Sequence, residues 1–328
     1  MNSNLTFARF VKVVLAFWLF ASVLTGQARI GVKYQMQLGN PTDAKADSSN
    51  HEHYLIQRSV FAADYDDRTG EPNWVSWDLT VDDMGLAKRT PTFHPDNELP
   101  VSFHRITSSE YKQSGFDRGH MCPSADRTAN AQDNDQVFTM ANIIPQTKDN
   151  NEGIWEHLEA YCRNLARQGN ELLIICGPAG FNGNHIPNGP VLIPSHTWKI
   201  IVVAPDGSGS VLKRIKPTTR VIAVDIPNTD GIRSDSWTKY VVSVNQIEAL
   251  TGYHFFSALA PDVATALRKK VDGRGLDNNA YAKTGHDSSH IANDQPPVWL
   301  YAAIAVLTML LVLIIGLLIV FFRTKPKR

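Results

Sequence analysis

An uncharged segment near the end of the chain sets the first constraint on the fold. Residues Val298–Phe322 carry no charged side chain over twenty-five positions, and a basic tail follows at 323–328. A helix of that length spans a hydrocarbon layer of about 30 Å, whereas a soluble helix needs a polar face that this segment lacks. The sequence therefore predicts a transmembrane helix at 298–322 with its basic tail in the cytoplasm.

The beginning of the chain is apolar in a different way. Arg9 and Lys12 precede the run Val13–Leu24, and small or polar residues follow as far as Ala28. The run is shorter than the roughly 20 residues of a span, so we expect a signal peptide over 1–28 that is cut near Ala28. An uncleaved anchor is the alternative. With the tail inside, the body of the protein lies outside the cytoplasm, in the periplasm or at the cell surface if the source is bacterial.

Charge and cysteine content narrow the function classes. Among the 328 residues, Lys and Arg together number 32, as do Asp and Glu, so attraction for a polyanion would need a local patch. The cysteines are Cys122, Cys162 and Cys176, an odd number that allows at most one internal disulfide. Their spacing does not suggest a zinc site. We expect Cys162 and Cys176 to be small buried apolar residues.

Between the two ends, the pattern predicts one α+β domain over 52–270 with a central antiparallel sheet. We expect a flexible lead-in at 29–51 and a polar linker at 271–297. The alternation predicts two hairpins, which pair 54–65 with 74–79 and 198–203 with 211–215. Further strands are expected at 137–145 and 219–226, and a strand buried on both faces is expected at 172–176.

Two helices are expected inside this domain. Apolar residues recur at helical spacing over 151–167, after Asp149 and Glu152, which resemble a capping pair. The stripe consists of Ile154, Trp155, Leu158, Cys162 and Leu165. A second helix is expected at 243–250, with Gly252 as its stop signal.

The chemistry is concentrated at residues 115–125, which read Gly-Phe-Asp-Arg-Gly-His-Met-Cys-Pro-Ser-Ala. Hydrolysis of a phosphodiester needs a base for water, stabilisation of the charge on the phosphoryl group and neutralisation of the leaving oxygen. His120 suits the first task because an imidazole titrates near neutral pH. Arg118 can hold an anion, and a divalent cation suits the other two tasks.

Three further residues follow on the predicted helix. Asn151 opens it, and its amide oxygen suits Mg²⁺, which prefers oxygen ligands and keeps most of its water. Glu159 lies two turns further on, where it can accept hydrogen bonds from water around the ion. Arg163, four positions later, can orient that carboxylate or reach phosphate.

Together these segments resemble the DNA/RNA non-specific endonuclease family, the ββα-metal nucleases that include endonuclease G. The resemblance covers about residues 54–260. It implies that His120 is the general base, that Arg118 contacts phosphate, and that Asn151 binds magnesium with Glu159 eight positions later. A further family arginine lies upstream, for which Arg89 and Arg105 are the candidates.

The resemblance also implies the reaction and its partners. The expected enzyme uses Mg²⁺, for which Mn²⁺ can substitute, and hydrolyses DNA and RNA to leave 5′-phosphates. The resemblance allows a homodimer but does not fix the oligomeric state. Lack of base specificity follows if the contacts are mainly to backbone phosphate.

Each site residue has a structural alternative. His120 can be a hydrogen-bonded loop residue, and Asn151 a helix cap. Glu159 and Arg163 can form an ordinary surface ion pair. Arg118 can brace the sheet through Asp117, itself expected to be structural.

Three other functions remain open at this stage. They are a non-catalytic nucleic-acid receptor, a surface adhesion protein and a phosphodiesterase for small nucleotides. Retention of the histidine and asparagine together disfavours the receptor.

Overall fold

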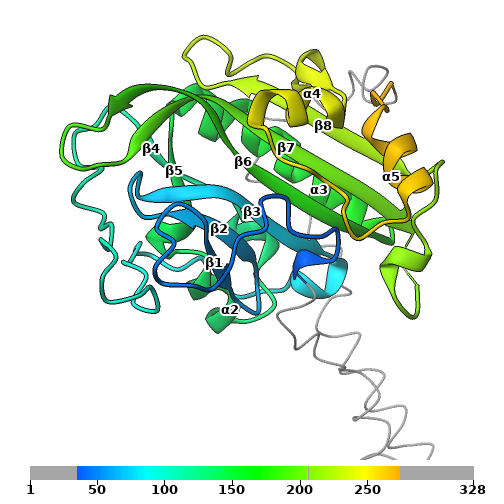
Figure 1. The fold of residues 1–328 in the computed structure, drawn as a ribbon, viewed down its shortest axis with the longest axis horizontal. Helices are drawn as coiled ribbons and strands as arrows, with labels where there is room; N and C mark the ends of the chain where they lie inside the picture. The colour runs from blue at the N-terminus through cyan, green and yellow to red at the C-terminus, as the bar shows by residue number, and fades with distance from the viewer. Residues whose placement is uncertain (1–34, 206, 274–328) are drawn as a thin grey trace, which may run out of the picture. The chain divides into compact units, whose positions relative to one another are not determined.

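The alternating strands of the chain build one antiparallel sheet of seven strands in the part that the structure describes, residues 35–205 and 207–273 of a computed structural model. The strand order is β1-β2-β3-β6-β7-β8-β9 (Figure 1). The strands are β1 (Tyr54–Gln57), β2 (Ala62–Asp66), β3 (Glu71–Leu79), β6 (Asn170–His185), β7 (Leu192–Pro205), β8 (Arg220–Pro227) and β9 (Val241–Val242). The expected central antiparallel sheet is therefore confirmed.

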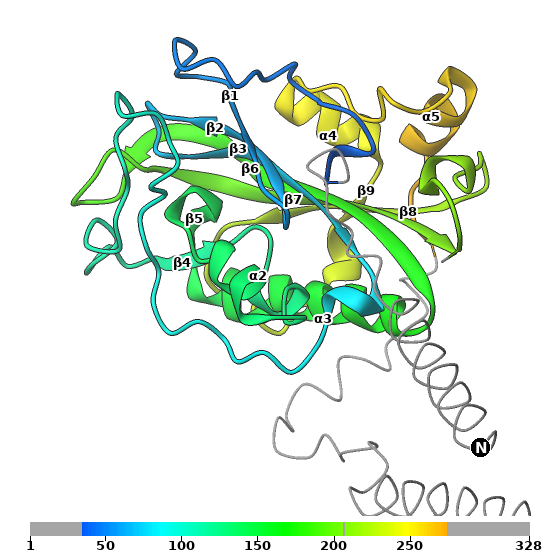
Figure 2. The same cartoon turned by 90° about the horizontal axis from the view of Figure 1, so that it is seen from below.

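Both faces of this sheet are covered, as Figure 2 shows. On one side lie α2 (Ala131–Gln136) and α3 (Glu156–Arg167), and on the other lie α4 (Val244–Thr251) and α5 (Pro261–Arg268). Successive side chains of a strand point to opposite faces. On β6, Leu172 and Ile174 therefore enter one core while Leu173 and Ile175 enter the other. Burial of each such side chain stabilises the fold by roughly 1.5–3 kcal/mol, and the strand predicted to be buried on both faces is confirmed.

A small second sheet carries the motif around His120. Strand β4 (Asp117–His120) pairs antiparallel with β5 (Ile143–Gln146), and the chain then enters α3. This order of two strands and a helix confirms the expected ββα unit. The predicted apolar stripe is buried in the core beneath the sheet. It anchors α3, so the polar face at the start of the helix is held next to β4.

The start of this helix differs from the expectation. The regular helix begins at Glu156, and residues Asn150–Trp155 form an irregular wider turn with a kink at Gly153. The expected capping pair is also wrong. The side chains of Asp149 and Glu152 both bind Arg233 instead of capping the helix. A loop that is distant in sequence thus satisfies the acidic residues at this helix start.

Several strand boundaries also need correction. The alternation at 54–65 is interrupted by a turn in which the Arg58 amide donates to the Phe61 carbonyl, so it forms β1 and β2 instead of one strand. The apolar run 137–145 contains a short 3-10 turn at Met140–Asn142, and only its end is strand. The hairpin expected between 198–203 and 211–215 is wrong, because β7 pairs with β8 and Val211–Lys213 is a 3-10 turn.

The second predicted helix is confirmed with its signals. α4 begins after Ser243, whose hydroxyl accepts a hydrogen bond from the Gln246 amide. It ends at Gly252, which has a φ of 76°. That left-handed conformation favours glycine because it lacks a Cβ.

The described part of the expected lead-in, residues 35–51, packs on the sheet. Leu38 and Ala44 are buried, and the side-chain oxygen of Gln35 accepts a hydrogen bond from the Asp78 amide. Packed structure is therefore present before residue 52, the expected start of the domain.

Several sequence predictions concern residues that lie outside the described ranges. They are the signal peptide at 1–28, the polar linker at 271–297 beyond residue 273, the transmembrane helix at 298–322 and the basic tail at 323–328. Within 35–205 and 207–273, no helix is both long and apolar enough to cross a bilayer.

Candidate active site

A polar cleft of 430 Å³ opens where β4 meets the start of α3. Every residue predicted for the site lines it: Arg118, His120, Asn151, Glu159 and Arg163. The remaining lining residues are Arg89, Pro123, Ser124, Ala125, Glu152 and Glu156. Three arginines thus face three glutamates around one histidine and one asparagine, an arrangement suited to both an anion and a cation.

His120 is held in an aromatic and cationic environment. Its ring centroid lies 5.0 Å from that of Phe93 and 4.8 Å from that of Phe138. The guanidinium of Arg89 lies over Phe138, and that of Arg118 lies over Phe93. Burial first, and then the charges of Arg89 and Arg118, lower the pKa of His120 to about 3. The imidazole is therefore neutral at physiological pH and able to accept a proton.

The orientation of Asn151 is fixed by the residue that begins β4. The Asn151 amide nitrogen donates to a carboxylate oxygen of Asp117 over 3.0 Å. A carboxylate can only accept, so the bond determines which end of the amide faces Asp117. The amide oxygen of Asn151 has no protein donor within the described residues and remains available on a residue that lines the cleft.

Glu159 belongs to a buried charge network below the cleft. Its carboxylate lies 3.5 Å from the Lys199 ammonium and 3.9 Å from the Arg163 guanidinium. Arg163 also contacts Asp126 and Glu156. Burial raises the pKa of Glu159 to about 7, although Lys199 and Arg163 oppose that shift. The ordinary surface pair is therefore excluded, because Glu159 and Arg163 are each only 8% exposed.

A close contact at Gly119 and a chain of hydrogen bonds link β4 to the start of the helix. A Cβ on Gly119 would lie within 2.6 Å of the buried Gln146 side chain. That side chain donates to the Asn150 amide oxygen, and the Asn150 nitrogen donates in turn to Thr197 on β7. The glycine of the motif therefore admits the contact that ties the helix start to the main sheet.

The residues present fit a hard divalent cation. An amide oxygen oriented by Asp117 faces a cleft that Glu152, Glu156 and Glu159 also line. Mg²⁺ binds well with few protein ligands because it retains water. Within the described part of the chain, no cluster of three His, Cys, Asp or Glu side chains could hold a metal. The Asn151 amide oxygen is an oxygen ligand of the kind that such an ion prefers.

Comparison with known proteins agrees with this geometry. The model of the DNA/RNA non-specific endonuclease family matches residues 38–262. A protein named "Nuclease" from Nostoc sp. is 44% identical over 241 residues, which cover 74% of this chain and 87% of that protein. The chain belongs to the DNA/RNA non-specific endonuclease family.

Another relative and a solved structure match this chain at lower identity. The mitochondrial nuclease EXOG of Xenopus laevis is 30% identical over 60% of this chain, and the match spans 57% of that protein. A chain from the crystal structure of the EndoG/EndoGI complex superposes with a TM-score of 0.59 at 21% identity, covering 72% of this chain and 95% of that one. That likeness concerns the fold. The family assignment makes the chain a phosphodiester hydrolase of nucleic acids.

Some residues of this endonuclease site were not found from the sequence. Of the two upstream arginines, Arg89 lines the cleft, while Arg105 donates to the Leu99 carbonyl elsewhere. Asp117 was expected to be structural, and it accepts a hydrogen bond that orients the amide of Asn151. Lys199 gave no signal because it lies inside an apolar strand, where it is 1% exposed with its ammonium 4.0 Å from the Trp155 ring centroid.

The cysteines of this endonuclease are all thiols. Cys122, Cys162 and Cys176 are buried and none forms a disulfide. Burial raises the pKa of both Cys162 and Cys176 to about 12. They act as apolar packing groups behind the cleft, as expected for Cys162 and Cys176.

Proposed function

We propose that this chain is a Mg²⁺-dependent endonuclease that cleaves DNA and RNA with His120 as the general base. The observation that supports it most strongly is the meeting of a neutral buried His120 and an oriented Asn151 in one arginine-lined cleft. A bound Mg²⁺ would stabilise negative charge on the phosphoryl group and the leaving oxygen. Asn151 would hold it, and Mn²⁺ is expected to substitute.

The side chains then have separate roles. Arg118 and Arg89 bind the phosphate, and their pairing with it reduces the positive charge that lowers the pKa of His120. His120 then takes a proton from a water molecule as the oxygen of that water forms a bond to phosphorus. The bond from phosphorus to the 3′-oxygen breaks, so the product carries a 5′-phosphate. Arg163 and Lys199 keep the Glu159 carboxylate in place to accept hydrogen bonds from water in the cleft.

The role of His120 is tested by its replacement. His120→Ala should reduce cleavage roughly 10²–10⁴-fold, the usual effect of losing a general base. Melting curves should show that the variant is folded, and end-labelling of wild-type products should detect 5′-phosphates. Near-normal activity in this variant would remove His120 from the chemistry, and 3′-phosphate products would exclude the proposed bond cleavage.

We further propose that the endonuclease is held in a membrane by the helix at 298–322, with its catalytic domain outside the cytoplasm. The proposal rests on the uncharged twenty-five-residue run and the basic tail that follows it. Protease added to cells whose outer layer has been made permeable, with the cytoplasmic membrane left intact, should remove the domain but not the tail. A domain that stays protected until the cytoplasmic membrane is broken would contradict this topology.

A further inference from the structure

A second polar hollow lies directly beside the catalytic cleft. It encloses 510 Å³ and shares Arg118 with the cleft, so this guanidinium forms part of the wall of both. Its lining residues are Ser108, Ser109, Tyr111, Lys112, Gln113, Phe116, Asp117 and Arg118. A hollow of this size is within the range of sites that hold a small organic ligand. Among the residues that line this hollow, Asp117 and Arg118 are the ones to which a role has been assigned above.

The wall of the hollow is built by fixed contacts. Glu110 binds both the backbone amide and the hydroxyl of Thr107, which folds residues 107–110 into a turn. The Asn188 side chain, from the tip between β6 and β7, donates to the Lys112 carbonyl. Gln113 has a φ of 58°, an uncommon conformation for a residue with a side chain. The loop is thus held in one shape, and its hollow is present before any ligand binds.

The chemistry of the lining suits a nucleotide. Lys112 and Arg118 supply positive charge, and neither has an ion-pair partner in residues 35–205 and 207–273. The one carboxylate in the lining, Asp117, already accepts from Asn151. The Gln113 side-chain amide lines the hollow, and the half-buried Phe116 offers an aromatic ring. The hydroxyls of Ser108 and Ser109 already bond the Phe93 carbonyl and the Thr107 hydroxyl, so they add polarity to the wall. Cations that bind phosphate beside a ring that stacks on a base are the usual means of binding single strands.

We propose that this hollow binds the nucleotide that flanks the scissile phosphate on the substrate strand. Its phosphate contacts Lys112 and Arg118, and its base packs against Phe116. The inference rests on the proposed function, because Arg118 connects the hollow to the cleft where that phosphate is cut. A base can enter the hollow only when it leaves its stack, so unpaired segments are the preferred ligand.

Kinetics with the full chain in detergent separate the hollow from the cleft. Phe116→Ala should raise KM for a 12-nucleotide single strand roughly five- to hundredfold, as expected for the loss of one base–aromatic stack. Turnover of a small chromogenic phosphodiester, which fills only the cleft, should change less than twofold. Equal losses on both substrates would show a general defect and overturn the proposal.

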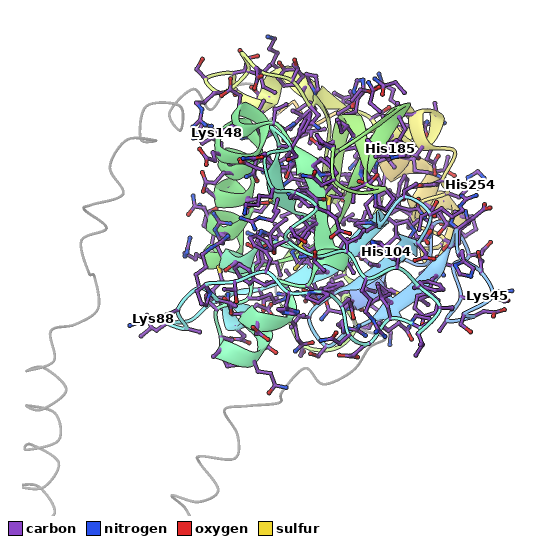
Figure 3. All side chains as sticks on the ribbon, turned by 90° about the vertical axis from the view of Figure 1, so that its left-hand side faces the viewer. Lys45, Lys88, His104, Lys148, His185 and His254 are labelled. Carbon is purple, nitrogen blue, oxygen red and sulfur yellow. The ribbon has the colours of Figure 1, made fainter. Side chains whose placement is uncertain are left out.

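Binding measured in EDTA tests the hollow without relying on cleavage. Lys112→Ala should weaken binding of a fluorescent single strand and reduce the slope of log Kd against log salt by about 0.7, the value for one phosphate contact. Lys45→Ala is the matched control, because Lys45 is also exposed and lines neither the hollow nor the cleft. Figure 3 shows it on the opposite side of the domain from Lys88, which precedes the cleft residue Arg89.

The outcomes of the two experiments are distinct. An inactive wild type whose binding still depends on Lys112 and Phe116 would remove the proposed function and keep the binding site. An active wild type whose KM and salt slope are the same in both variants would keep the function and overturn the site. Lys112 is exposed, so its variant is expected to fold even if Phe116→Ala does not.

Discussion

His120, the proposed general base, illustrates how neighbouring residues set the charge state of an imidazole. Its pKa of about 3 reflects burial first and then the charges of Arg89 and Arg118. Its Nε2 is buried and has no hydrogen-bond partner within the described residues. The imidazole is therefore neutral in the resting protein. In the proposed mechanism, a phosphate that pairs with the two arginines would raise the pKa of His120, so proton transfer would be coupled to substrate binding.

Asp117 positions Asn151 through a hydrogen bond, and two substitutions separate the loss of this bond from the loss of the carboxylate charge. Asp117→Ala removes the acceptor of the Asn151 amide, so the Mg²⁺ concentration for half-maximal activity should rise about tenfold, the lower end expected for loss of such a partner. Asp117→Asn can still accept that hydrogen bond through its amide oxygen and should lie between the wild type and the alanine variant. An identical Mg²⁺ requirement in all three proteins would show that Asp117 does not position Asn151.

Lys199 is expected to tune the pH dependence through Glu159. Its positive charge opposes the burial that raises the pKa of Glu159 to about 7. In Lys199→Met that opposition is lost and the pKa rises further, so the carboxylate forms only at higher pH. The acidic limb of log kcat/KM should therefore move to higher pH, while Lys199→Arg, which retains the charge, should move it less. A uniform loss at every pH would assign Lys199 a purely structural role.

Residue type and spacing in the sequence were enough to predict which residues meet in one cleft. His120, Arg118, Asn151, Glu159 and Arg163 all reached one cleft. Prediction from the sequence failed where a role depends on contacts between distant segments. Nothing near Lys199 in the sequence shows that β7 passes below α3, and only the folded loop distinguishes Arg89 from Arg105.

At the scale of elements, the start of α3 depends on a glycine. A Cβ on Gly153 would lie 2.9 Å from the Cα and 3.0 Å from the carbonyl oxygen of Arg233. Arg233 is also the residue that binds Asp149 and Glu152. The irregular turn at 150–155 therefore arises because the chain near Arg233 packs closely on it. Helical periodicity cannot reveal such an approach, which explains why the kink at Gly153 was not predicted.

Gly153→Ala should consequently disturb both the fold and the site. The added Cβ meets backbone atoms that cannot rotate away, so overpacking should cost about 1–3 kcal/mol of unfolding free energy. The shift in the helix start should also raise the Mg²⁺ requirement by displacing Asn151. Gly273→Ala is the control, because a Cβ there meets nothing within 4 Å. Equal melting temperatures and metal requirements in the two variants would disprove this role.

At the scale of the whole molecule, equal numbers of acidic and basic residues leave recognition to local groups. In the proposed function, Arg89 and Arg118 of the cleft, with Lys112 in the neighbouring hollow, are the positive groups that would follow a phosphate backbone. The sheet was predicted correctly because its strands are strongly apolar and alternate. The connections between strands were less predictable, since the pairing of β7 with β8 spans a loop that resembles a tight turn.

The central claim is best tested by cleavage with the full chain in detergent. Plasmid DNA and RNA should each be incubated with Mg²⁺, with EDTA, and with the His120→Ala variant in Mg²⁺. The account predicts metal-dependent cutting of both polymers that falls at least about a hundredfold in the variant. A folded wild-type protein that cuts neither polymer with any divalent cation, or a variant that cuts as fast as the wild type, would contradict it.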